Sequence, residues 1–168
     1  MKIATLVAWA ALWTAPFACA QKLDLKFNAL AAKASTKAEI DLDGALLKLA
    51  IHAASGQDAS GLLSGVQAVH IRTYEFENSG AYSQKDLDAL HGQVTSQSRW
   101  SKVLNIKEDD STTEIFIAAA GDQVSGILIL SAEERELSVI YLEGSMTLGQ
   151  MRRIMNGRHE LAELFGDH

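Results

Sequence analysis

Apolar residues recur at helical spacing in two early segments, separated by a short alternating segment. Over residues 24–35 the apolar stripe is Leu23, Phe27, Leu30, Ala31 and Ala34. The second stripe is Leu46, Leu47, Leu49, Ala50 and Ala53, with Lys48, His52 and Ser55 on the polar side. A spacing of three to four residues predicts amphipathic helices. Asp43 precedes the second helix and is placed to cap it.

Other segments follow the strand period of two. In residues 38–43, Ile40 and Leu42 fall on one face and the acidic residues on the other, which predicts a half-buried strand. Residues 66–77 are rich in β-formers. The region after Trp100 predicts four strands, over residues 100–107, 112–120, 124–131 and 136–143. Residues 127–130 are continuously apolar, so we expect that strand to be central and covered on both faces.

Two further helices are marked by capping boxes. Ser83 and Asp86 stand at the S-x-x-D spacing, and Thr147 and Gln150 repeat the pattern before a second apolar stripe of Met151, Ile154 and Met155. Asn156-Gly157 predicts the end of that helix. The order predicts an α+β fold, a two-layer domain with a mostly antiparallel sheet, a C-terminal four-strand meander and three to four packed helices. We expect one domain over residues 21–157, then a short helical turn and frayed tail over 158–168.

The N-terminus has the features of a cleavable signal peptide over residues 1–20. Lys2 gives a positive start, residues 3–13 are apolar apart from Thr5, and Pro16 breaks the helix. Ala18 and Ala20 supply the small residues that signal peptidase requires, with cleavage before Gln21. Later apolar stretches are short and interrupted, so we expect no transmembrane segment in the mature chain.

Two alternatives to cleavage after Ala20 remain. An uncleaved anchor would use residues 3–20, which are barely long enough to span a bilayer. A surface lipoprotein would be acylated at Cys19, although Pro16 stands where a Leu-like residue is wanted. Cys19 is the only cysteine, so cleavage before Gln21 would remove all thiol chemistry. A cysteine-free exported protein of this size points to a bacterial periplasm or exterior.

Composition narrows the class of partner. Hydrophobic residues make up 48% of the chain and charged residues 21%, which is typical of a globular protein. The formal charge is −6, and removal of Lys2 makes it −7. Nucleic-acid binding depends on clustered Lys and Arg. We therefore expect no nucleic-acid partner, and instead an envelope protein or a small ligand that the sequence does not identify.

The sequence offers no strong catalytic or cofactor motif. Neither the G-x-S-x-G elbow of serine hydrolases nor a glycine-rich phosphate loop occurs. The histidines lack metal-ligand spacing. We expect His52 and His70 to be exposed and His91 to be a buried, hydrogen-bonded histidine on the apolar face of its helix. Trp100, Tyr74 and Phe76 are expected in the core. We assign no catalytic residue and no cofactor.

Three acidic residues form the one weak metal candidate. Glu39, Asp41 and Asp43 are two residues apart on a predicted strand, so they point the same way. Carboxylates grouped in this manner suit a hard cation or acid–base chemistry. The simpler interpretation is a solvent-facing acidic surface, with Asp43 used as the helix cap.

Several segments together resemble a known family. They are the signal peptide, the Ala-rich helix with Leu46-Leu47, the run L-L-S-G-V-Q-A-V-H-I-R-T-Y-E-F of residues 62–76, and four strands that end with residues 138–144. This arrangement resembles the DUF4252 family, exported bacterial proteins without an assigned activity. The likeness covers about residues 22–150, and its motifs are structural. The resemblance implies localisation and fold, and carries over no catalytic residues.

The sequence therefore favours an exported, non-enzymatic binding or accessory domain of the bacterial cell envelope, periplasmic or secreted. The first alternative is a metal-dependent or hydrolase-like enzyme that uses the acidic strand face. The second is a surface lipoprotein.

Overall fold

The structure is a computed structural model that describes residues 23–53, 63, 65–97 and 99–156. Within these residues, no helix is both long enough and apolar enough to cross a bilayer. The predicted signal peptide, with Cys19 and the cleavage residues Ala18, Ala20 and Gln21, lies outside the described residues, as does the predicted tail over 158–168.

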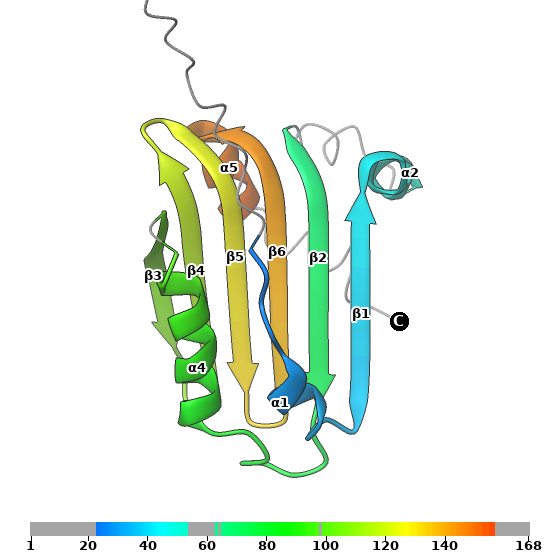
Figure 1. The fold of residues 1–168 in the computed structure, drawn as a ribbon, viewed down its shortest axis with the longest axis vertical. Coiled ribbons are helices and arrows are strands. Elements are labelled where there is room, and N and C mark those ends of the chain that lie inside the picture. The colour runs from blue at the N-terminus through cyan, green and yellow to red at the C-terminus, as the bar shows by residue number, and fades with distance from the viewer. Residues whose placement is uncertain (1–22, 54–62, 64, 98, 157–168) are drawn as a thin grey trace, which may run out of the picture.

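Six antiparallel strands form a single sheet in the order β1-β2-β6-β5-β4-β3 (Figure 1). The strands are β1 (Thr36–Asp43), β2 (Val66–Glu75), β3 (Trp100–Lys107), β4 (Ser111–Ala120), β5 (Gln123–Glu133) and β6 (Glu136–Thr147). Strands β3 to β6 pair in sequence, and β6 then pairs with β2. The predicted α+β class and the antiparallel sheet are confirmed.

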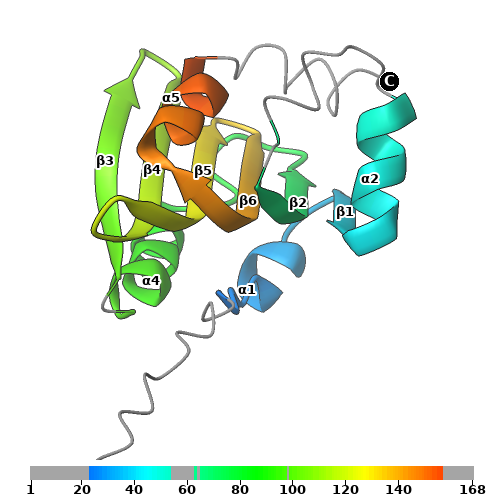
Figure 2. The ribbon, with the colours of Figure 1, turned by 90° about the horizontal axis from the view of Figure 1, so that it is seen from above.

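Four helices accompany the sheet in the described residues. They are α1 (Asn28–Ala31), α2 (Gly44–Ala53), α4 (Gln84–Thr95) and α5 (Leu148–Asn156). Seen from above, α1 and α4 lie on one side of the sheet and α5 on the other, with α2 beside β1 (Figure 2). We call these two sides the α4 face and the α5 face. Because helices lie on both faces, the two-layer expectation is too simple.

Each face has its own hydrophobic cluster, because successive strand residues point to opposite sides. On β5, Leu128 belongs to the cluster beneath α4, with Leu90 and Val94 of that helix. Its neighbour Ile127 belongs to the cluster that contains Leu47 of α2, against which Met151 of α5 packs. The continuous apolar run of β5 is thus explained by cover on both faces, as expected.

The two predicted capping boxes are both formed. The backbone N–H of Ser83 donates to Asp86 Oδ2 at 2.8 Å, and the N-cap side chain and the N3 backbone complete the box. At α5, the Thr147 N–H donates to Gln150 Oε1 at 2.8 Å, and the Gln150 N–H donates to Thr147 Oγ1 at 3.3 Å. These local signals start helices where tertiary packing also needs them.

The predicted helix over residues 24–35 is wrong for most of its length. Only Asn28–Ala31 are helical. In residues 23–27, Leu23, Leu25 and Phe27 turn inward while the residues between them are exposed. Gln93 of α4 replaces helical hydrogen bonds at Lys26: its side chain accepts from the Lys26 N–H at 2.7 Å and donates to the Lys26 carbonyl at 3.2 Å. Burial against the sheet has overridden the helical period.

The apolar stripe predicted for α2 is only partly buried. Leu47 is buried, whereas Leu46 and Leu49 are 56% and 67% exposed. The helix lies beside the edge strand β1 (Figure 2). Less of its apolar side therefore packs against the sheet than the sequence pattern predicts.

Candidate functional site

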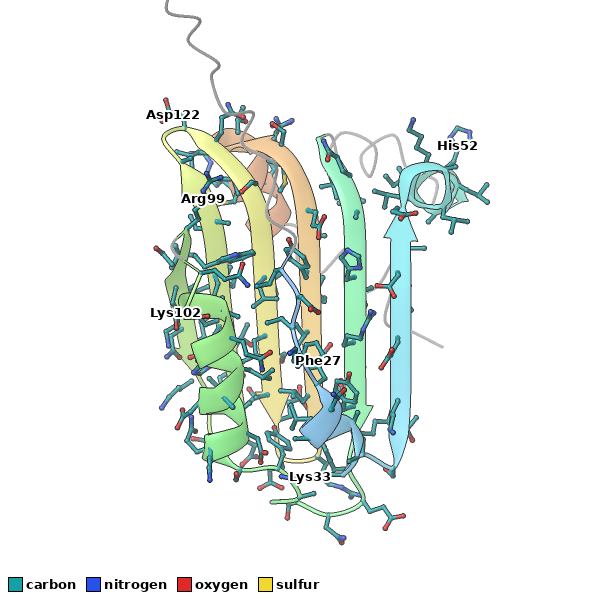
Figure 3. The ribbon with its side chains drawn as sticks, in the orientation of Figure 1. Phe27, Lys33, His52, Arg99, Lys102 and Asp122 are labelled. Carbon is teal, nitrogen blue, oxygen red and sulfur yellow. The ribbon has the colours of Figure 1, made fainter. Side chains whose placement is uncertain are left out.

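A cleft of about 560 Å³ lies on the α4 face, between residues 23–27 and strands β1, β2 and β6. One side is apolar, with Leu23, Leu25, Phe27, Val139 and Tyr141, and the other is charged, with Asp24, Asp41, Asp43, His70 and Arg72. Figure 3 shows Phe27 in front of the sheet, near α1. A cleft with an apolar wall and a few fixed polar groups is the usual form of a small-ligand site.

Asp41 is the centre of the charged side. Arg72 Nη2 donates to both of its carboxylate oxygens, at 2.8 and 2.9 Å. His70 Nδ1 lies 2.5 Å from Asp41 Oδ1, and because a carboxylate accepts, Nδ1 carries the proton. The hydrogen bond from His70, followed by the contacts with Arg72, lowers the pKa of Asp41. The Asp41 carboxylate is therefore held ionised and oriented.

His70 is enclosed by its neighbours. Its ring stacks on Tyr141 with the centroids 5.6 Å apart, and its side chain is only 16% exposed. His70 Nε2 lies 3.6 Å from Glu143 Oε1, and both atoms are buried without a hydrogen-bond partner among the described residues. The expectation that His70 is exposed is wrong, because β2 is an interior strand and its α4 face is covered here.

Tyr141 links the sheet to the segment that closes the cleft. The Leu23 N–H donates to its hydroxyl at 3.4 Å. Burial, more than the nearby Glu143, raises the pKa of Tyr141 far above its ordinary value. The hydroxyl therefore stays protonated at any physiological pH.

The geometry suits binding better than nucleophilic catalysis. Asp41 and His70 form an oriented pair, but the free nitrogen of the imidazole faces Glu143. The described residues that line the cleft include no Ser, Thr or Cys. Acyl transfer of the Ser-His-Asp kind needs such a nucleophile within hydrogen-bonding reach of the imidazole.

The structure brings the three predicted acidic residues onto one face. Glu39, Asp41 and Asp43 share the α4 face of β1 because they are two residues apart. Asp41 binds Arg72 and His70, and Arg72 Nε lies 3.8 Å from Glu39 Oε2. Within the described residues, no group of three or more His, Cys, Asp or Glu side chains converges as metal ligands do.

The sequence prediction missed the pairing of these acidic residues with His70 and Arg72. The register places Glu39 opposite Arg72 and Asp41 opposite His70. The sequence nevertheless contains a pattern that could have predicted this pairing. Residues 39–43 carry an acidic residue at every second position, and residues 70–72 carry basic residues at the same spacing. Opposite charges on facing positions favour strand pairing.

A second polar cluster lies under α4. Glu114 is 4% exposed and is the one buried charged side chain of the described residues. Its Oε1 accepts from Lys102 Nζ at 2.9 Å and from Asn105 Nδ2 at 3.3 Å, and its Oε2 contacts His91 Nε2. His91 is thus half-buried and touches a carboxylate, but its Nε2 has no hydrogen-bond partner among the described residues, so the expectation of a buried, hydrogen-bonded histidine is met only in part. Burial of a carboxylate is tolerated here because Oε1 accepts two hydrogen bonds, one of them from the charged Lys102, while Oε2 has no hydrogen-bond partner among the described residues.

The other residues singled out from the sequence are a histidine expected at the surface and three aromatic residues expected in the core. His52 is exposed and points away from α2 (Figure 3). Trp100, Tyr74 and Phe76 are buried in the cluster of the α4 face, as expected.

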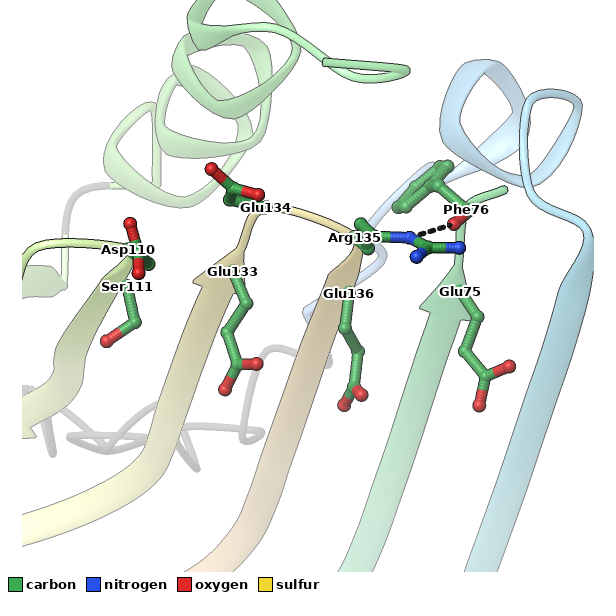
Figure 4. A pocket seen from close by; sticks show the side chains of 8 residues that line it. All are labelled: Glu75, Phe76, Asp110, Ser111, Glu133, Glu134, Arg135 and Glu136. Atoms are coloured by element: carbon green, nitrogen blue, oxygen red, sulfur yellow. Dashed lines mark hydrogen bonds between the residues drawn. The ribbon is translucent and has the colours of Figure 1, made fainter. Parts of the chain in front are cut away.

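A second hollow, of about 610 Å³, is lined largely by carboxylates. Glu75, Glu133 and Glu136 extend in the same direction from three neighbouring strands (Figure 4). Burial, followed by the charges of Glu133 and Glu75, raises the pKa of Glu136. Arg135 does not neutralise them, because its side chain donates to the carbonyls of Phe76 and Glu77. We therefore interpret this hollow as an acidic patch of the surface and assign no binding site to it.

The motifs behind the family resemblance prove to be points of close packing. Val66 lies opposite Gly144 in the pairing of β2 with β6. A Cβ on Gly144 would lie 2.1 Å from the Gly65 carbonyl oxygen, and Gly65 itself has a φ of +90°. The glycines before Val66 and after Leu142 are therefore required by backbone contact.

The search of curated proteins gave no match. The profile of a family described as "Domain of unknown function (DUF4252)" matches residues 32–154. The match begins before β1 and ends within α5, so it includes the whole sheet. Since it covers well over half of the sequence, the chain belongs to the DUF4252 family.

Proposed function

We propose that this protein is an exported, non-enzymatic binding domain of the bacterial cell envelope, and that it binds a small ligand with a cationic group and an apolar body. The observation that carries the binding role is the cleft on the α4 face. Its apolar wall faces a charged side, on which Arg72 is already engaged by Asp41. Asp24 and Asp43 leave an excess of negative charge, which favours a cation.

Export is supported by Lys2, the apolar residues 3–13 and the small residues before Gln21. Expression of the full chain in a bacterium, with mass spectrometry of the mature N-terminus, tests it. We expect an N-terminus at Gln21. A diacylated Cys19 would favour the surface lipoprotein instead, and an intact Met1 in the cytoplasm would contradict export.

The binding role is tested with two small probes of similar size and opposite charge. Phenethylamine carries a cation and 3-phenylpropionate an anion on the same ring. In amide NMR spectra of the processed protein, we expect the amine to shift residues 23–27 and the neighbours of Tyr141, with a dissociation constant of about 1–10 mM for so few atoms. The anion should shift them far less.

A matched pair of variants locates the contact. Asp24→Asn removes one cleft charge and should weaken phenethylamine binding about two- to fivefold, the usual size for an exposed charge. Asp122→Asn removes an exposed charge in the β4–β5 turn and should leave binding unchanged. Equal shifts with both probes, or equal effects of the two variants, would show that the proposed ligand class is wrong.

The competing hypothesis is a metal-dependent or hydrolase-like enzyme on Glu39, Asp41 and Asp43. We expect no rise in melting temperature with Mg²⁺, Ca²⁺, Mn²⁺ or Zn²⁺, because Asp41 is occupied by Arg72 and His70. A rise that disappears in the Asp41→Ala, Asp43→Ala double variant would replace our proposal with this one.

A further inference from the structure

Strand β1 forms one edge of the sheet, and of the described residues only those of β2 pair with it. Seven of its eight residues are exposed. In an antiparallel edge strand, alternate N–H and C=O groups point outward, away from the sheet. The outer side of β1 therefore offers a row of backbone donors and acceptors to an incoming strand.

The side chains of β1 divide sharply between the two faces. The α4 face carries Lys37, Glu39, Asp41 and Asp43, and the α5 face carries Ala38, Ile40 and Leu42. Ile40 is 37% exposed, although it belongs to the apolar side of the strand. An added strand would place its own alternate side chains beside these two rows.

The acidic row is only partly neutralised from within the molecule. Asp41 is matched by Arg72 and His70 of the neighbouring strand. Glu39 has 54% of its side chain exposed and lies 3.8 Å from Arg72 Nε, and Asp43 is exposed at the end of the strand. Opposite charges at facing positions of paired strands stabilise the pair, and like charges oppose it.

We propose that the free edge of β1 binds an extended segment of a partner protein, in which basic residues alternate with apolar ones. Backbone hydrogen bonds join the segment to β1. Its basic side chains lie beside Glu39 and Asp43, and its apolar side chains lie beside Ile40 and Leu42. This is recognition by strand addition, with charge giving the specificity. It goes beyond the proposed function, because it uses the outward backbone groups of β1 and shares only the Asp43 side chain with the charges proposed to attract the ligand of the cleft.

A second copy of this chain fits the edge poorly. Pairing β1 with β1 would bring together two rows that each carry three carboxylates and one lysine, Lys37, so like charges would outnumber opposite ones. The opposite edge, β3, does carry Lys102 and Lys107, but its pairing register shifts between Lys102 and Leu104, and Lys102 is already bound to Glu114. A bulge of this kind interrupts an edge and protects it from pairing.

The test uses three seven-residue peptides with blocked ends. One alternates Lys and Val, and one alternates Glu and Val. The third repeats the first with every backbone amide N-methylated, so that it cannot donate backbone hydrogen bonds to β1. Titration calorimetry on the processed protein should show binding of the Lys peptide and at least tenfold weaker binding of the other two. Hydrogen exchange should slow at alternate amides of β1.

Two charge-reversed variants of equal net change complete the design. Glu39→Lys with Asp43→Lys should weaken the Lys peptide at least tenfold and bind the Glu peptide instead. Glu108→Lys with Asp122→Lys, in turns away from β1, should change neither affinity more than twofold. The milder Glu39→Gln, Asp43→Asn variant should lose binding to an intermediate degree, so the test survives if charge reversal unfolds the strand.

Three outcomes would overturn the proposal. The first is an equal affinity of the Lys peptide for both charge-reversed variants, or no binding at all. The second is binding that the N-methylated peptide retains, since this would exclude strand addition. The third is a concentration-dependent dimer that is lost on reversal of Glu39 and Asp43, which would make the occupant a second copy.

Discussion

Gly126 and Gly144 are strand residues whose side-chain space is taken by other parts of the molecule. A Cβ on Gly126 would lie 2.9 and 3.0 Å from ring atoms of Trp100 and 3.3 Å from Tyr141. The two rings meet edge to face above it, with centroids 5.7 Å apart. At Gly144 the neighbour is backbone, the Gly65 carbonyl. A ring edge in a packed core yields more easily than a strand backbone.

We therefore expect the two substitutions to differ in cost. Gly126→Ala should lower the free energy of unfolding by about 1–3 kcal/mol, the usual cost of overpacking. Gly144→Ala should cost more than Gly126→Ala, because β2 and β6 must separate locally. Urea unfolding, followed by the fluorescence of Trp100, measures both changes.

Gly92 supplies the control for this comparison. It lies in α4, and apart from its chain neighbours and the nearby backbone of that helix, no described heavy atom lies within 4 Å of a Cβ placed there. Gly92→Ala should stabilise the protein by about 0.5–1 kcal/mol, through helix propensity alone. A Gly144→Ala variant as stable as Gly92→Ala would contradict the close backbone contact.

Among the elements, an ion pair joins the turn that follows α1 to the first turn of α4. Lys33 Nζ donates to both oxygens of Asp86, at 3.0 and 2.8 Å. Asp86 also closes the capping box of α4 with Ser83. The hydrogen bond from Lys33, followed by those from Ser83, lowers the pKa of Asp86 from its ordinary value of 3.8 to about 2. The Asp86 carboxylate thus caps the start of α4 and also binds Lys33, which follows α1.

The lowered pKa of Asp86 predicts that the free energy of unfolding depends on pH. Because the folded pKa is depressed, the stabilisation is complete above the unfolded pKa near 4 and declines as the pH falls toward 2. The difference in free energy of unfolding between the unmodified protein and Asp86→Asn should be larger at pH 6 than at pH 2. Urea titrations at the two pH values measure it. Asp88→Asn, on the same helix, is the control, and a pH-independent difference for Asp86→Asn would contradict the prediction.

At the scale of the whole molecule, the sheet is shared between two hydrophobic clusters. Ile127 and Leu128 are adjacent on β5, and both are essentially inaccessible to solvent, one in each cluster. Because both clusters contain residues of the same strands, separation of these strands would expose both clusters to solvent. The described residues should therefore unfold as a single cooperative unit.

Truncation of either residue tests this coupling. Ile127→Ala and Leu128→Ala should each lower the free energy of unfolding by about 2–5 kcal/mol. In both variants, Trp100 fluorescence and far-UV circular dichroism should follow the same transition. Trp100 lies on the α4 face and is the only Trp after residue 20. A fluorescence transition that is unaffected by Ile127→Ala would mean that the faces unfold independently.

The sequence by itself determined most of the local structure. Strand β3 has the predicted bounds, and the starts of α4 and α5 follow from capping boxes. These features depend on residues a few positions apart, and the common face of Glu39, Asp41 and Asp43 depends only on the strand period. The resemblance to the family was likewise visible in the sequence, because the run of residues 62–76 and the end of the last strand are contiguous segments.

Only the tertiary structure decided which segments meet. The sequence pattern does not show that β6 lies between β2 and β5, or that Asp41 pairs with His70, because these contacts join residues far apart in the chain. Residues 23–27 are the clearest case. Their spacing favours a helix, but Leu23, Leu25 and Phe27 gain more by covering the sheet in an extended conformation, with Gln93 of α4 satisfying the backbone of Lys26. Local preference is weak, and burial against a surface formed by the rest of the chain outweighs it.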